Sequence, residues 1–96
     1  MHIYCQEKIM SDISIQNQTQ LMSAIAKHIL GEATGLKITG SPDKVSATKN
    51  VIIASKKLYE ELNLSKPQIE NIFRLVEEKK AKAEIFENKT GLRWTI

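Results

Sequence analysis

Residues suited to catalysis or metal binding are few in this chain of 96 residues. There are two histidines, His2 and His28, and one cysteine, Cys5. Neither histidine has another ligand type at the spacing of a metal site, and a single cysteine cannot form an intramolecular disulfide. The sequence has no nucleophile elbow and no phosphate-cradling glycine loop, and the adjacent Glu60 and Glu61 point in different directions. We therefore expect no enzymatic activity, no metal site and no cofactor.

Lysines at helical spacing offer another chemistry, the neutralisation of phosphates. Lys49 and Lys56 are seven residues apart, so they align on a helix, with Lys57 one step round and Lys44 near the helix start. Such a basic edge binds nucleic acid in a sequence-independent and salt-sensitive way. The alternative is a solvated helix surface without a partner. The predicted nucleic-acid-binding residues are Lys37, Lys44, Lys49, Lys56, Lys57 and Arg93.

The composition is that of one globular domain. Hydrophobic residues make up 42% of the chain and charged residues 26%, which is typical of folded rather than disordered proteins. The 14 Lys and Arg residues exceed the 11 Asp and Glu residues, which gives a net charge of +3 and permits an acidic partner. No apolar run approaches the roughly 18 residues that a membrane span needs, and no signal-peptide pattern is present. We therefore expect a cytoplasmic protein without a membrane partner.

The first ten residues, MHIYCQEKIM, show no clear period. They are predicted to be a disordered or non-native N-terminal extension, and residues 11–96 a single helical domain. Codons a few residues before Met10 can spell a bacterial ribosome-binding site, so Met10 is one candidate for the native start. The other interpretation is a native, disordered N-terminus that begins at Met1. If the chain starts at Met10, His2 and Cys5 have no function.

Two helices are predicted in the first two thirds of the chain from apolar residues at helical spacing. The first covers residues 14–31, with Asp12 or Ser14 as its cap and Gly31 as a stop. The second begins at the stretch SPD, residues 41–43, which supplies a cap, a proline at the first helical position and an acid in the first turn. It should run to about residue 63.

A third helix is predicted after SKPQ, residues 65–68, which fits a capping box with Ser65 as the cap. The link from the second helix would then be so short that the two form a helical hairpin. The predicted apolar faces are Ile15, Met22, Ile25, Ala26 and Ile29 in the first helix, Val51, Ile52, Leu58, Tyr59 and Leu62 in the second, and Ile69, Ile72, Phe73, Val76, Ala83 and Phe86 in the third.

One phrase occurs twice, as TGLKIT at residues 34–39 and as TGLRWT at residues 90–95. Each glycine would end a helix, and the alternation that follows is a strand signal. Because such short strands are not stable alone, we predict that residues 36–39 and 92–95 pair as a two-stranded ladder, with Lys37 and Arg93 together on its outer side. The alternative is two extended linkers that follow similar helix ends. The predicted fold is mainly α, a small three-helix domain in the order α-β-α-α-β.

From about residue 25 to residue 90 the chain resembles the small double-strand-DNA-binding proteins of T-even-type tailed phages, which are linked to late transcription. The matching pieces are Ala26-Lys27, LKITG at residues 36–40, EELN at residues 60–63, the region of Leu75, and IFE at residues 85–87 with Thr90. The spacing between LKITG and EELN is longer here, and GLRWTI lies outside the resemblance. The resemblance implies duplex DNA as partner and a bacterial or phage-infected cell as setting.

The first hypothesis is therefore a phage or prophage accessory protein that binds double-stranded DNA. The second is a helical protein-interaction module, an inhibitor or adaptor of a host or phage protein, with Ile53, Leu64 and Trp94 as contact candidates. An exposed tryptophan is a frequent anchor at interfaces, whereas the favoured interpretation of Trp94 is a cover for the core. A homodimer in which the terminal strand pairs with its symmetry mate is compatible with both hypotheses.

Overall fold

The structure, a computed structural model, describes residues 11–14, 17–33 and 35–96 of the chain. It is mainly helical and contains the three predicted helices. The N-terminal extension, with His2, Cys5 and Met10, lies outside the described residues. The elements in chain order are β1 (Ser11–Ser14), α1 (Gln18–Ile29), β2 (Leu36–Thr39), α2 (Pro42–Leu62) and α3 (Ile69–Thr90).

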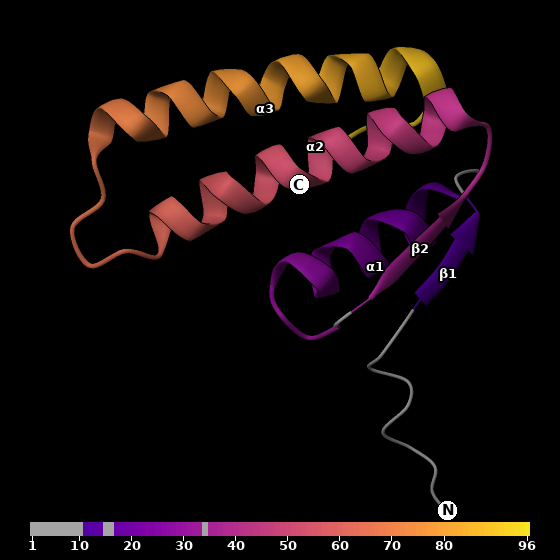
Figure 1. Cartoon of the computed structure of the whole chain (residues 1–96), viewed down its shortest axis with the longest axis horizontal. Helices are drawn as coiled ribbons and strands as arrows, with labels where there is room; N and C mark the ends of the chain where they lie inside the picture. Colours follow the sequence, from indigo (N-terminus) through magenta and orange to yellow (C-terminus); the bar gives the residue numbers. More distant parts are fainter. Residues whose placement is uncertain (1–10, 15–16, 34) are drawn as a thin grey trace, which may run out of the picture.

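The helices α2 and α3 form the long axis of a flat molecule with principal extents of 47 × 33 × 19 Å. Figure 1 shows them as an antiparallel hairpin, with α1 and the two strands beside the part of α2 that holds its N-terminus. The other end of the hairpin projects beyond α1. The predicted hairpin is therefore confirmed, and only one end of it is covered by further elements.

The boundaries of α2 and the end of α1 follow local chemistry, whereas the start of α3 needs a correction. Pro42 opens α2 and Gly31 follows α1 with a φ of +82°, as predicted. The predicted cap of α3 at Ser65 is wrong, because the helix begins at Ile69 with Gln68 as its cap. Pro67 disfavours a helical conformation in the residue before it, so residues 63–68 remain a loop. The N–H of Gln68 then donates to the Glu61 carboxylate at 2.8 Å.

The first helix is shorter than the predicted range of 14–31. Its cap is Asn17, whose Oδ1 accepts a hydrogen bond from the Gln20 N–H at 2.9 Å. This bond satisfies one of the free amides of the first turn. The residues predicted to cap the helix, Asp12 and Ser14, belong to strand β1 instead. Ile15, predicted on the apolar face, lies outside the described residues.

The predicted ladder between residues 36–39 and 92–95 is wrong. The strand β2 pairs in parallel with β1, in the register Ser11 to Leu36 through Ser14 to Thr39. Gly91, in the left-handed conformation with φ of +75°, ends α3 and turns the following residues back along the hairpin. The order of elements is therefore β-α-β-α-α, and Lys37 and Arg93 are not brought together by strand pairing.

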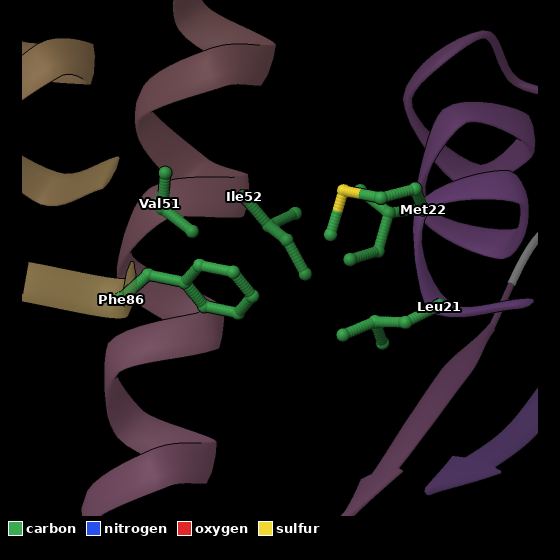
Figure 2. Close-up of a cluster of buried hydrophobic side chains, with 6 residues drawn as sticks. Leu21, Met22, Val51, Ile52 and Phe86 are labelled. Carbon is green, nitrogen blue, oxygen red and sulfur yellow. The ribbon is translucent and has the colours of Figure 1, made fainter. Parts of the chain in front are cut away.

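The core lies where α1, α2 and the C-terminal half of α3 meet. Figure 2 shows Leu21 and Met22 of α1 facing Val51 and Ile52 of α2, with Phe86 of α3 beside them. Phe86, Leu21 and Val51 are fully buried, and burial of apolar surface is the main stabilising contribution to folding. The residues packed against this cluster from outside are Ile29, Leu36, Ile38, Val45, Ala83, Leu92, Trp94 and Ile96.

Three residues of the predicted apolar faces are exposed. Leu62 is 47% exposed, Ile69 67% and Phe73 68%. All three lie at the end of the hairpin that projects beyond α1 (Figure 1). Leu62 lies on the buried face of α2, eleven residues after Val51, at an end that no described element covers. Phe73 lies about 140° round α3 from Phe86 and about 160° from the buried Leu75, on the outer side of the helix. The predicted face of the third helix is therefore wrong for Phe73, and it did not include Leu75.

Candidate nucleic-acid interface

Lysines line the side of α2 that faces away from the core. Lys49 and Lys57 are exposed and Lys56 is half-buried. The opposite side of the helix is buried, with Val51, Ile52 and Ser55 among its residues. Because a helix repeats every 3.6 residues, the burial of that side leaves positions 49, 53, 56 and 57 together towards solvent. The helix thus places three of the six predicted cations on one surface, around the exposed Ile53.

Strand β2 adds a fourth cation to this surface. Its residues alternate, with Leu36 and Ile38 half-buried and Lys37 exposed, as expected for a strand with one covered face. Lys37 and Lys49 line the same depression, together with Gly35, Leu36 and Ile38. Leu36 and Ile38 pack against the core cluster that includes Val51 and Ile52 of α2, so the strand lies near Lys49 without the predicted ladder. We call Lys37, Lys49, Lys56 and Lys57 the basic face.

The other two predicted cations lie apart from the basic face. Lys44 is in the first turn of α2, about 140° round the helix from Lys49 at 100° per residue. Arg93 is exposed, and its backbone is held at the start of α1. The side-chain amide of Gln18 donates to the Arg93 carbonyl at 2.7 Å and accepts from the Arg93 N–H at 2.8 Å. The structure thus gathers four of the six residues and separates two.

The cations of the basic face are not neutralised by neighbouring acids within the described part of the chain. The ion pairs found there are Arg74 with Glu78, Lys80 with Glu77, and Lys89 with Asp43, at 3.4 to 3.8 Å. None of them includes a cation of the basic face. Glu60 follows Lys56 by four residues and lies exposed at the edge of the surface. Glu61 follows Lys57 by four residues and lines the same depression as Lys57 and Glu60. The basic face therefore carries four cations next to two flanking acids, which leaves it a net positive charge.

The three protein-contact candidates have different environments. Ile53 is 53% exposed in the middle of the basic face, and Leu64 is 54% exposed in the loop between α2 and α3. Trp94 is half-buried and packs against the core, edge-on to Phe86 with the ring centroids 5.2 Å apart. Its Nε1–H donates to Ser55 Oγ at 3.2 Å. Trp94 therefore covers the core, which leaves Ile53 and Leu64 as exposed candidates.

The exposed apolar residues at the hairpin end were missed as functional candidates by sequence reasoning. Leu62 follows the period of the buried residues of α2, so no local signal marks it as exposed. Ile69 and Phe73 lie about 100° or more round α3 from the buried Leu75 and Phe86, so the helical period does separate them. The fully buried Leu21 was absent from the predicted face of the first helix, although it lies four residues before Ile25.

Other kinds of site were sought over the residues that the structure describes. No group of three or more His, Cys, Asp or Glu side chains with the geometry of a metal site occurs among them. Within the same residues, no helix is both long and apolar enough to cross a membrane. The chain matches no family model, and neither a curated protein nor a solved structure matches it.

Proposed function

We propose that this chain is a non-enzymatic accessory protein of a phage or prophage that binds the backbone of double-stranded DNA through the basic face. The observation that carries the proposal is the position of Lys37 beside Lys49 at one depression, continuous with Lys56 and Lys57 on α2. Cations without ion-pair partners release counterions when they meet phosphates, which drives association.

The side chains of the basic face favour duplex over single-stranded nucleic acid. Single-strand binding relies on aromatic side chains that stack on bases. Among the described residues the basic face presents an aliphatic side chain, Ile53, between its lysines. Backbone contacts by lysine carry no sequence information, so the proposed binding is independent of sequence. The resemblance of LKITG, residues 36–40, to phage double-strand-DNA-binding proteins supports the same partner, since Lys37 lies within it.

The experiment compares binding of a duplex of about two helical turns by the intact chain and two double variants. Lys49→Gln with Lys56→Gln removes two cations of the basic face. Lys27→Gln with Lys80→Gln removes two exposed cations from α1 and α3. The two double variants therefore have the same net charge as each other. Association is measured by fluorescence anisotropy over a series of salt concentrations.

The expected slope of log K against log salt is about −3 to −4 for four phosphate contacts. The Lys49 and Lys56 double variant should lower the magnitude of this slope by about two, whereas the Lys27 and Lys80 double variant should leave it nearly unchanged. Absence of binding at low salt contradicts the proposal. An equal loss in both variants would show that net charge, and not this face, attracts the duplex.

A second candidate function is that of a helical protein-interaction module, an adaptor or inhibitor. The observation that favours it is the group of large apolar side chains exposed at the hairpin end, led by Ile69 and Phe73. Contiguous exposed apolar surface of this kind marks interaction sites. The basic face and the hairpin end involve different residues, so the two functions can be tested separately.

A further inference from the structure

Residues 92–96 show what kind of segment packs against the side of the α2–α3 hairpin. In residues 92–96 the exposure alternates, with Leu92, Trp94 and Ile96 half-buried and Arg93 and Thr95 exposed. This segment runs back along α3 as an extended chain. Its contacts move from Phe86 and Ser55, at Trp94, to Tyr59 and Lys79, at Ile96.

Polar groups on both helices hold the backbone of this segment. The Tyr59 hydroxyl and the Lys79 ammonium donate to the Ile96 carbonyl at 3.2 and 3.3 Å. The Glu87 carboxylate accepts the Trp94 N–H at 2.9 Å. The side of the hairpin therefore binds an extended segment by burying alternate apolar side chains while helix side chains satisfy its backbone.

The same side continues beyond Ile96 as an uncovered apolar surface. Leu62 follows Tyr59 by three residues along α2, and Val76 precedes Lys79 by three along α3, so both lie on the faces that contact the segment. Phe73 and Ile69 precede Lys80 and Val76 by seven residues each and continue the row. Ile69 and Phe73 are about two thirds exposed. We call Leu62, Ile69, Phe73 and Val76 the hairpin-end surface.

An acidic flank runs beside the hairpin-end surface. Glu70, Glu77 and Glu84 recur every seven residues on α3 and are exposed, so they form one stripe next to the apolar row. Lys80 lies in the row itself and pairs with Glu77 at 3.8 Å. The flank therefore keeps a net negative charge and complements a basic partner.

We propose that the hairpin-end surface binds an extended segment of a partner protein in which apolar residues alternate with lysine or arginine. The apolar side chains would lie against Phe73 and Ile69, as Trp94 and Ile96 already lie against the next turns of the hairpin. The basic side chains would lie towards Glu70 and Glu77. This interaction is independent of the proposed DNA binding, because it uses none of the four lysines of the basic face.

The test uses two synthetic fluorescein-labelled peptides of eight residues. The basic peptide has the sequence Lys-Leu-Arg-Trp-Lys-Ile-Arg-Val, and in the acidic peptide each Lys and Arg is replaced by Glu. Binding to the full chain is measured by anisotropy near physiological salt. The variants are Ile69→Ser with Phe73→Ser, and Glu70→Lys with Glu77→Lys. The control is Ile85→Ser, which removes an exposed isoleucine from another face of α3.

The basic peptide should bind the intact chain and the Ile85 variant equally. The Ile69 and Phe73 double variant should weaken binding at least about tenfold, because it removes the buried apolar contact. The Glu70 and Glu77 double variant should reverse the preference in favour of the acidic peptide. These serines replace side chains that are already mostly exposed, so circular dichroism of the variants should match that of the intact chain.

Three outcomes would overturn the proposal. One is absence of binding by the basic peptide, and another is equal binding of both peptides. The third is a concentration-dependent dimer of the intact chain, seen by sedimentation, that disappears in the Ile69 and Phe73 double variant. That result would show that a second copy of this chain, and not a basic segment of another protein, covers the surface.

Discussion

Two phenylalanines of the same helix show how much the surroundings decide the role of a residue. Phe86 is fully buried against Val51, Ile52 and Trp94, whereas Phe73 is 68% exposed. Both belong to α3 and both were predicted on its apolar face. The thirteen residues between them place the two side chains about 140° apart round the helix, so Phe86 points into the core and Phe73 away from it. One residue type therefore belongs to the core at one position and to the surface at the other.

Replacement of each phenylalanine by alanine should separate these roles. Phe86→Ala leaves a cavity in a close-packed core and should lower the free energy of unfolding by about 3–5 kcal/mol, a large share of the stability of so small a domain. Phe73→Ala should change it by no more than about 0.5 kcal/mol. Urea denaturation followed by circular dichroism measures both. A similar loss in the two variants would mean that Phe73 is covered in solution.

At the scale of elements, the two copies of the repeated phrase, TGLKIT and TGLRWT, have similar local structure but different tertiary contacts. Residues 36–39 and 92–95 both follow a glycine and both alternate in exposure. The first copy is a strand paired with β1, while the second lies against α2 and α3. Local sequence specifies an alternating extended segment. It does not specify the partner, because either copy offers the same backbone groups.

The sequence signals for helices likewise predicted local structure and not tertiary packing. The stretch SPD at residues 41–43 predicted the start of α2, whereas SKPQ at residues 65–68 predicted a start three residues too early. The alignment of Lys49, Lys56 and Lys57 followed from the helical period alone. The separation of Lys44 and Arg93 from them, and the exposure of Leu62, depended on tertiary packing that no local signal encodes.

The side chain of Gln18 in α1 holds the backbone of residues 92–96 at Arg93. Its amide makes two hydrogen bonds to the backbone of Arg93, at 2.7 and 2.8 Å. Gln18→Ala removes both bonds and should cost about 1 kcal/mol of stability. It should also increase quenching of Trp94 fluorescence by acrylamide, because the backbone next to Trp94 is then no longer held to α1. Gln20→Ala, an exposed change on the same helix, is the control and should leave quenching unaltered. Unaltered quenching in the Gln18 variant would show that apolar packing alone fixes the segment.

At the scale of the molecule, the two ends of the α2–α3 hairpin differ. One end is covered by other described elements, and the other end is not. The N-terminal half of α2 and the C-terminal half of α3 lie in the core, tied by the ion pair between Asp43 and Lys89 at 3.7 Å. The other end has the loop of residues 63–68 and the hairpin-end surface, and among the described elements α2 and α3 pack there only on each other. Lys37 and Lys49 of the basic face lie over the first region, Lys56 and Lys57 extend it towards the hairpin end, and the hairpin-end surface lies over the second region.

This division predicts a gradient of amide hydrogen exchange along the hairpin. Amides near Ile52 and Phe86 exchange only when the core opens, whereas those near Leu62 and Phe73 exchange when the hairpin end frays. We expect protection at the core positions to exceed that at the hairpin end on the order of 100-fold, which corresponds to roughly 2.7 kcal/mol. Two-dimensional NMR of the full chain in deuterated solvent measures both.

Addition of the basic peptide should raise protection at the hairpin end selectively, since a ligand stabilises the conformation that it binds. Uniform protection along α2 and α3 in the free chain would show that the hairpin end is as stable as the core, and the gradient would then be refuted.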